Sequence, residues 1–310
     1  METPDFTVVV VNYNGVRHLG PCLAALAAQT LPRHRFEVVL VDNASADDSV
    51  ARVRADYPWV RVVRRPANEG FAGGNNAGLP FARGRVVVLL NNDTVPDPHW
   101  LAELVAGAVP GAATVSKLVF AHAPTTLNSA GLELLRDGRG CDRGFRHADV
   151  GQFETPGAVF AGCGAALAID AASLDGPLFD PRYFVYYEDL DAFWRAALAG
   201  RAGRYAPRSL VRHVHGGSAG EESPLFRFHV ERNRALTSLR NADPFLAVWN
   251  ALGLVARVAR SGLKWVVGRE RGPMFRATAR ALASFLAHAP AVVVERYVTR
   301  SRRAVPCGSS

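Results

Sequence analysis

A group of carboxylate and amide side chains follows an apolar run in the first third of the chain. The run Val86–Leu90 ends in Asn91, Asn92 and Asp93. Five unbroken apolar residues predict a strand buried on both faces, and ligands of open α/β sheets bind at the carboxyl ends of the strands. A carboxylate beside two amides suits a hard divalent cation that carries phosphate oxygens. An Asx turn or a helix cap at Asp93 explains the same residues, so both interpretations stay open here.

A second group of acids, Glu188, Asp189 and Asp191, opens a predicted helix. The helix dipole stabilises negative charge at that end, but capping alone requires one acid rather than three. The aromatic residues just before them could belong to a core or bind the faces of a sugar: Tyr183, Phe184, Tyr186 and Tyr187. Arg195, four residues after Asp191, is expected to form an ordinary ion pair along the helix.

A glycine-rich segment, residues 68–78, and two histidines could add contacts to phosphate. The glycines allow a backbone to approach a ligand closely, and a helix starting there would direct N–H groups at phosphate. The segment has no Gly-Lys-Ser/Thr of a Walker loop and does not follow the first strand, as a dinucleotide fingerprint does. His213 and His215 are expected on a strand with side chains that cannot both face the same way, so that one of them reaches the metal or a phosphate.

The elements that position these residues alternate between strands and helices. Strands are predicted at 6–11, 36–41, 60–63, 86–90, 113–120 and 159–169, and helices at 17–29, 49–57 and 98–109. Such an order indicates βαβ units and a parallel sheet with right-handed crossovers. Residues 121–156 are polar and rich in loop-forming residues, and we expect a flexible lid or acceptor loop there.

Composition limits the partners and the compartment. The chain has 310 residues, of which 49% are hydrophobic and 21% charged, and a net charge of +8. This predicts a globular protein with a polyanionic partner: nucleic acid, an anionic membrane surface or a phosphorylated substrate. The cysteines, Cys22, Cys141, Cys163 and Cys307, form no zinc or disulfide pattern. With no signal peptide and no run of about 18 apolar residues, a cytoplasmic protein that does not span the membrane is expected.

The positive charge is concentrated after residue 241. Asp243 and Pro244 predict a helix start, and the helix that follows carries an apolar stripe with Arg257, Arg260 and Lys264 opposite. The stripe comprises Phe245, Val248, Leu252, Val255, Ala259, Leu263 and Val266. Two interpretations stay open: an ordinary helical cap on the sheet, or an interfacial helix pair on anionic lipid at the inner face of the plasma membrane. Nucleic acid is not expected, because no binding motif accompanies the charge.

Taken in order, five motifs resemble the family 2 inverting glycosyltransferases of the GT-A fold, and more narrowly the bacterial rhamnosyltransferase-like members. They lie at residues 10–15, 41–45, 68–78, 90–93 and 179–191, and the resemblance covers residues 5–240. It implies an α/β fold of the GT-A type: a Rossmann-like, mostly parallel sheet flanked by helices. The expected domains are 1–240, with a nucleotide-sugar half (5–110) and an acceptor half (111–220), and a basic helical appendage, 241–310.

The resemblance also implies roles for individual residues. Asp189, with Glu188 beside it, would be the general base, and Asp93 with His213 (or His215 in its place) would hold Mg²⁺ or Mn²⁺. Acceptor binding is expected at Gly162, Cys163, Tyr187 and Asp191. The residues expected to bind the nucleotide-diphospho-sugar are Asn12, Tyr13, Asn14, Asp42, Asn68, Gly70, Asn76, Asn91 and Asn92.

Two positions depart from the family pattern. Asn91 replaces the first acid of the metal motif, and Asn75 stands where the family often has an arginine. The expected activity is an inverting, metal-dependent transfer of a hexose, with rhamnose from dTDP-rhamnose favoured, to a lipid-linked or polysaccharide acceptor. A nucleotidyltransferase is one alternative, although Asn12–Gly15 has none of the basic residues such an enzyme places after its first strand. A nucleotide-sugar-binding or scaffolding protein with a weak site is the other, because of Asn91.

Overall fold

A computed structural model describes residues 3–108, 111–174, 176–201, 203–215 and 223–304, and the side chains up to residue 298. Ser218, five residues after His213, and Cys307 lie outside this part. The chain divides into two compact units: residues 1–133 with 141–217 form an α/β unit, and residues 134–140 with 218–310 form a helical unit.

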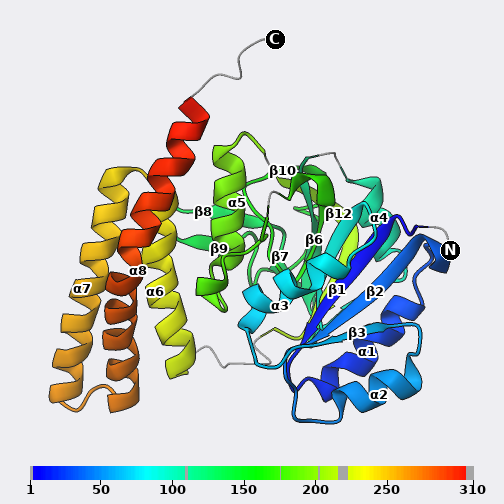
Figure 1. The fold of residues 1–310 in the computed structure, drawn as a ribbon, viewed down its shortest axis with the longest axis horizontal. Helices are drawn as coiled ribbons and strands as arrows, with labels where there is room; N and C mark the ends of the chain where they lie inside the picture. The colour runs from blue at the N-terminus through cyan, green and yellow to red at the C-terminus, as the bar shows by residue number, and fades with distance from the viewer. Residues whose placement is uncertain (1–2, 109–110, 175, 202, 216–222, 305–310) are drawn as a thin grey trace. The chain divides into compact units, whose positions relative to one another are not determined.

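The α/β unit is built on a ten-stranded mixed sheet (Figure 1). One half is parallel: β3, β2, β1 and β4 lie side by side in that order. In the other half, β11 runs antiparallel between β4 and β6, whereas β6 and β12 are parallel to each other. The strands are β1 (Phe6–Asn12), β2 (Phe36–Asp42), β3 (Arg61–Arg64), β4 (Val86–Asn91), β5 (Thr94–Pro96), β6 (Ala113–Phe120), β7 (Ala123–Ser129), β10 (Gly157–Val159), β11 (Ala166–Asp170) and β12 (Gly203–His213).

Helices cover both faces of this sheet because its central strands contain unbroken apolar runs. In β1, Val8 and Val10 face one side, where they pack with residues of α1 (Val16–Ala27), α2 (Ser49–Asp56) and α4 (Trp100–Ala106). Val9 faces the other side, with residues of α3 (Gly70–Gly78) and α5 (Glu188–Leu198). Side chains of a strand alternate between faces, so an unbroken apolar run requires two covered faces. The predicted α/β fold is confirmed.

Two local predictions differ from the structure, and a third segment has a role that the sequence did not predict. The predicted strand 159–169 is two strands, β10 and β11, separated by a loop that contains Gly162 and Gly164. Residues 121–156 are not a flexible loop, because β7 pairs with β6 and the short strands β8 (Leu132–Leu134) and β9 (Gly140–Asp142) pair with each other. The glycine-rich segment is helix α3, and a Cβ added at Gly74 or Gly78 would lie 2.5–2.6 Å from valine side chains of β1. These glycines therefore bring the helix close to the sheet.

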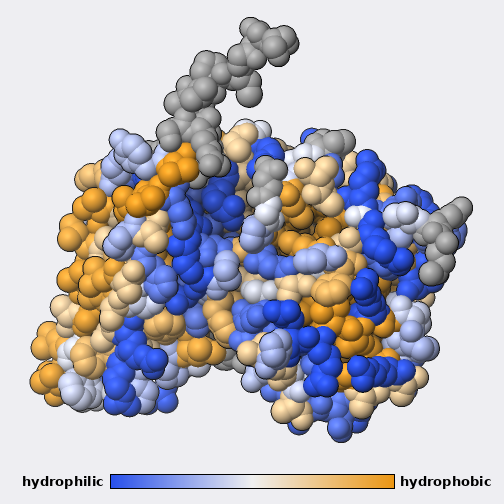
Figure 2. All heavy atoms as spheres, in the orientation of Figure 1, coloured by the Kyte–Doolittle hydropathy of each residue, from blue (hydrophilic) through white to orange (hydrophobic). Residues whose placement is uncertain are grey.

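The helical unit contains α6 (Pro224–Asn241), α7 (Pro244–Val266) and α8 (Gly272–Ala304). The side chains of Ser223 and Asp243 cap α6 and α7 by accepting hydrogen bonds from backbone N–H groups three residues later. The unit includes α6, so it begins before residue 241, where the sequence analysis placed the boundary. Within α8, residues 272–298 are long and apolar enough to cross a membrane by length and composition alone, which was not expected from the sequence. Apolar residues gather over α7 (Figure 2).

Candidate active site

The parallel half of the sheet brings several predicted residues to one edge. Asn12, at the end of β1, lies beside Asp42, at the end of β2, and Val11 lies beside Asn91, at the end of β4. Asn92 and Asp93 form the turn that follows β4. The carboxyl ends of parallel strands thus collect one carboxylate from β2 and one from the turn after β4, as the alternation of strands and helices predicted.

Asp93 lies against His213 because β5 pairs with β12. Thr94 is opposite His213 in this pairing, and the backbone N–H of Val214 donates to the carbonyl of Asp93 at 3.0 Å. The Nε2 atom of His213 is 3.3 Å from Oδ1 of Asp93. Burial alone would raise the pKa of Asp93, but the hydrogen bond from His213 and the charges of His213 and His18 lower it below its ordinary value. Asp93 is therefore held as an anion.

Asn128, at the end of β7, fixes the protonation pattern of both histidines. Its Oδ1 is 2.8 Å from Nδ1 of His213, and its Nδ2 is 3.3 Å from Nδ1 of His215. An amide oxygen can only accept, so Nδ1 of His213 carries a proton; the amide nitrogen can only donate, so Nδ1 of His215 does not. With Nδ1 of His213 occupied by Asn128, Nε2 is the nitrogen that faces Asp93, where it can donate to the carboxylate or, with an ion bound, act as a metal ligand. This favours His213 over His215.

The expectation that the two histidines cannot face the same way is wrong. Their rings lie 5.6 Å apart, and both contact Asn128. Residues two apart on a strand share a face. The strand also ends at His213, and His215 has a left-handed backbone with φ of 58°.

The Asp93–His213 pair fits a divalent ion that is shared with a substrate. A neutral imidazole lone pair facing a carboxylate at 3.3 Å is unfavourable unless a proton or a cation lies between them. Among the described residues, no three His, Cys, Asp or Glu side chains gather as a possible metal site. Mg²⁺ and Mn²⁺ take carboxylate and water ligands, and in phosphate-binding sites they are completed by substrate oxygens.

The residues predicted to bind the nucleotide have unequal exposure. Asn12 is buried and uses its amide on Asn92 (2.8 Å) and Ser45 (3.1 Å), so it shapes the site from within. The carboxylate of Asp42 is fully buried; its Oδ2 lies 3.5 Å from Nε of Arg64 and has no hydrogen-bond donor among the described residues. The ring of Tyr13 is 47% exposed and is available to a ligand. Asn14 accepts from the N–H of Ala46.

Asn43, which the sequence analysis did not single out, links two of the predicted loops. Its Nδ2 donates to Oδ1 of Asn68 at 3.0 Å and to the carbonyl of Gly70 at 2.9 Å. Gly70 has φ of 70°, and an added Cβ would lie 2.3 Å from the carbonyl oxygen of Phe184. That carbonyl accepts from the N–H of Ala72, so the first turn of α3 binds protein rather than presenting all its N–H groups to phosphate.

Asn76 and Asn75 are engaged within the protein. The amide of Asn76 donates to the carbonyl of Phe179 at 2.6 Å and accepts from the N–H of the same residue at 3.1 Å. Asn75 is buried and donates to the carbonyl of Phe71. These bonds hold Asn76 between α3 and the segment before α5.

Asp189 is held at the same edge by the loop before β11. Its Oδ2 accepts from the N–H of Gly164 at 3.2 Å, and its Oδ1 accepts from the N–H of Leu190 at 2.7 Å. The next residue of that loop, Ala165, accepts from the N–H of Asn91 at 2.9 Å. One loop therefore connects the proposed base to the turn that carries Asp93.

Asp189 and three ionisable groups around it share a poorly solvated environment. Burial raises the pKa of Asp189, and burial together with the charge of Asp189 raises the pKa of Glu188 well above its ordinary value. Burial and the same charge raise the pKa of Asp142 to about 6, although a hydrogen bond from Ser129 opposes the shift. Burial and the charges of Asp142 and Asp189 also raise the pKa of Cys163. Glu188 and Asp142 each have a buried carboxylate oxygen without a hydrogen-bond donor in the described part of the chain.

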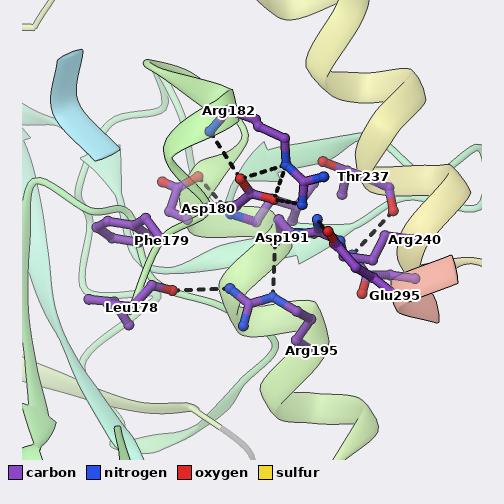
Figure 3. Close-up of polar contacts among 12 residues, drawn as sticks. Leu178, Phe179, Asp180, Arg182, Asp191, Arg195, Thr237, Arg240 and Glu295 are labelled. Atoms are coloured by element: carbon purple, nitrogen blue, oxygen red, sulfur yellow. Dashed lines mark hydrogen bonds and ion pairs between the residues drawn. The ribbon is translucent and has the colours of Figure 1, made fainter. Parts of the chain in front are cut away.

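Asp142 was missed by the sequence analysis, and two predicted acceptor residues have structural partners. Oδ2 of Asp191 lies 3.0 Å from Nε of Arg195, whose Nη2 donates to the carbonyl of Leu178 (Figure 3). The predicted ion pair along the helix is thus present, and Asp191 is fully buried in it. A Cβ added at Gly162 would lie 2.8 Å from the side chain of Val115 in β6.

The segment before α5 is strained. Phe184, Tyr186 and Tyr187 have φ between 64° and 72°, which is rare for bulky residues. Such outliers persist where the surrounding structure imposes them and cluster at functional sites. Tyr187 precedes Glu188 and Asp189 directly, so this strain sets the direction in which the acids enter the site.

Comparison with known proteins finds related sequences and structures. The family described as Glycosyl transferase family 2 matches residues 7–148. The chain is 35% identical over 108 residues to the succinoglycan biosynthesis protein ExoO of Rhizobium meliloti, which covers 34% of this chain and 30% of ExoO. It is 26% identical over 290 residues to the N-acetylglucosaminyl-diphospho-decaprenol L-rhamnosyltransferase of Mycobacterium tuberculosis, covering 80% and 88% of the two chains. The chain spans about a third of the length of several curated relatives, ExoO among them.

A solved structure shares the fold. The mannosyltransferase PcManGT from Pyrobaculum calidifontis, in complex with GDP-Man and Mn²⁺, superposes with a TM-score of 0.53 at 19% identity, covering 100% of this chain and 77% of that one. The fold is therefore GT-A. Residues 7–148 match the description of a glycosyl transferase family 2 domain.

Proposed function

We propose that this protein is an inverting, divalent-metal-dependent glycosyltransferase that moves a hexose from a nucleotide-diphospho-sugar to an acceptor hydroxyl. The observation that carries the proposal is the loop 163–165, which holds Asp189 through the N–H of Gly164 and Asn91 through the carbonyl of Ala165. It supports a site at one edge of the sheet in which the carboxylate of Asp93 binds a cation and the carboxylate of Asp189 acts as a base.

The chemistry requires a base and a stabilised leaving group. Asp189 accepts the proton of the acceptor hydroxyl while the oxygen attacks the anomeric carbon, and the bond from that carbon to the diphosphate oxygen breaks. Attack from the face opposite the leaving group inverts the anomeric configuration. When bound by Asp93 and His213, a divalent ion would neutralise the charge that develops on the diphosphate. Asp42 and Tyr13 would bind the nucleoside, through the buried carboxylate and the exposed ring.

Rhamnose from dTDP-rhamnose is the sugar we propose, with a lipid-linked or polysaccharide acceptor in cell-surface glycan synthesis. The support is the rhamnosyltransferase named above, which aligns over most of both chains. A lipid-linked acceptor would place the reaction at the cytoplasmic side of the plasma membrane. Lipid-linked and polysaccharide acceptors differ in solubility, so an acceptor assay separates them.

The test is a donor screen with the full chain. dTDP-rhamnose, UDP-GlcNAc and GDP-mannose are each incubated with Mg²⁺ or Mn²⁺, and thermal stabilisation and release of nucleoside diphosphate are measured. We expect one donor to stabilise the protein and to be turned over only with the ion. NMR of the product should then show inversion. Stabilisation without turnover by any donor and acceptor would instead favour the nucleotide-sugar-binding protein.

A further inference from the structure

The helical unit exposes a continuous apolar stripe on α7. The stripe predicted from the sequence is solvent-exposed, with Phe245 at 78% and Val266 at 75%. Its large members are Phe245, Val248, Trp249, Leu252, Val255, Leu263, Val266 and, just after the helix, Val267. At 100° per residue these side chains occupy one third of the helix circumference, and Figure 2 shows apolar residues gathered over this helix.

The buried face of α7 is the less apolar one. It consists of Ala247, Asn250, Leu254 and Ser261. Asn250 is fixed there by hydrogen bonds to the carbonyl of Asp137 (3.0 Å) and from Arg234 (3.0 Å). A helix of a soluble protein packs its apolar stripe inward and exposes its polar side. In α7 the arrangement is reversed, and patches of this kind mark interaction sites.

The positive charge of the chain lies in the same region. Residues 241–310 contain eleven Lys and Arg against three Asp and Glu, a net charge of +8, which equals that of the whole chain. On α7, Arg260 and Lys264 are exposed, 60° and 100° around the helix from Phe245, so they border the stripe and do not lie opposite it as predicted. Arg269, Arg271, Arg276 and Arg280 are exposed in the following turn and in the first part of α8.

We propose that α7 docks on an anionic bilayer, with its apolar stripe in the acyl–headgroup boundary and its flanking cations at the lipid phosphates. Two exposed aromatic residues of the stripe, Phe245 and Trp249, fit this boundary. Arg257, Arg260 and Lys264 lie within the helix, so a spanning orientation of α7 would bury charge in the hydrocarbon. A second copy of the chain is a poorer occupant, because a two-fold contact would bring identical cations together.

Flotation with liposomes tests this proposal on the full chain. We expect binding to vesicles with 30% phosphatidylglycerol, at least tenfold weaker binding to pure phosphatidylcholine, and release in 0.5 M salt. The double variant Leu252→Glu/Leu263→Glu should lose binding at least tenfold while its melting temperature stays unchanged, because both side chains point outward. Val150→Glu, at a still more exposed apolar site in the α/β unit, is the control and should bind like the wild type.

Several results would overturn the proposal. These are absence of binding to anionic vesicles, equal binding to neutral ones, and unchanged binding by the double variant. A wild-type dimer in sedimentation that the double variant converts to a monomer would assign the stripe to a second copy. Protein from cells that resists carbonate extraction would point to α8 as a spanning helix instead. Because liposome binding is measured without substrate, these outcomes are independent of the proposed enzymatic activity.

Discussion

The pKa values of the carboxylates are shifted in opposite directions on the two sides of the candidate active site. At Asp93, His213 outweighs burial and lowers the pKa, so the group stays charged. At Asp189, Glu188 and Asp142, burial raises the pKa, and two buried oxygens of Glu188 and Asp142 have no hydrogen-bond donor among the described residues. A permanent anion suits a cation, and a carboxylate with a raised pKa suits proton transfer. The contrast supports the proposal that the metal binds at Asp93 and that the base is Asp189.

Replacing Asp189 by Asn should have the largest effect. The amide keeps the shape of the side chain but cannot take a proton, and we expect turnover to fall by about 10³-fold. Donor binding, measured by calorimetry, should stay within a few fold, because Asp189 acts on the acceptor hydroxyl.

The adjacent acid is the matched control for this variant. Glu188→Gln removes a carboxylate next to Asp189 and should reduce turnover far less. If Glu188→Gln abolishes turnover and Asp189→Asn does not, the base is Glu188 and the roles are exchanged.

On the metal side, Asp93→Asn should lower turnover by about 10²-fold at saturating donor. It should also raise the ion concentration needed for half-maximal rate, because one anionic ligand is lost. Asp97→Asn, four residues further on and 43% exposed at its side chain, should change neither quantity. Full activity of Asp93→Asn without added metal would remove the ion from this side of the site.

The sequence predicts both acids at the ligand edge but not the contacts that link them. Asp93 directly follows a strand and Asp189 opens a helix, and the resemblance to the family adds the roles that are proposed for them. Asn43, Asn128 and Asp142 were not predicted, because their neighbours are set by strand pairing far along the chain, such as β7 on β6 and β12 on β5. The glycine-rich segment was placed near the site, but only the packing shows that Gly74 and Gly78 contact strands.

Asn128→Ala should lower the affinity for the metal ion through its contact with His213. Without Asn128 the proton of His213 can move to Nε2, which then no longer offers a lone pair to an ion. Loss of such a hydrogen bond to a metal ligand typically costs 10- to 100-fold in metal affinity, and Mn²⁺ titration of turnover measures it. His215→Ala removes the other partner of Asn128 and should change the affinity less. An equal loss in both variants would mean that the two histidines bind the ion together.

Asp142→Asn should raise stability and lower activity, and it therefore tests whether Asp142 takes part in the reaction together with Asp189. The pKa of Asp142 is about 6 in the folded protein against an ordinary value of 3.8, so folding favours the protonated form. That contribution to the free energy of unfolding is fully present below pH 4 and is lost as the pH rises through 6, by up to about 3 kcal/mol. Asn stays neutral, so the variant should unfold at a higher temperature than the wild type at pH 7 and at the same temperature at pH 4. Turnover should fall by about tenfold.

Asp47→Asn should change the stability at pH 7 in the opposite direction. There, hydrogen bonds from Ser49 and Val16 outweigh burial and lower the pKa, so the carboxylate stabilises the fold above its ordinary pKa and Asp47→Asn should lower the melting temperature at pH 7. If Asp142→Asn also lowers it at pH 7, the carboxylate of Asp142 is paired in the folded protein and is not a strained member of the site. If it raises stability without any loss of turnover, Asp142 is buried beside Asp189 but does not take part in acceptor binding. Only the combination of gained stability and lost turnover places Asp142 with Asp189 on the proton-transfer side.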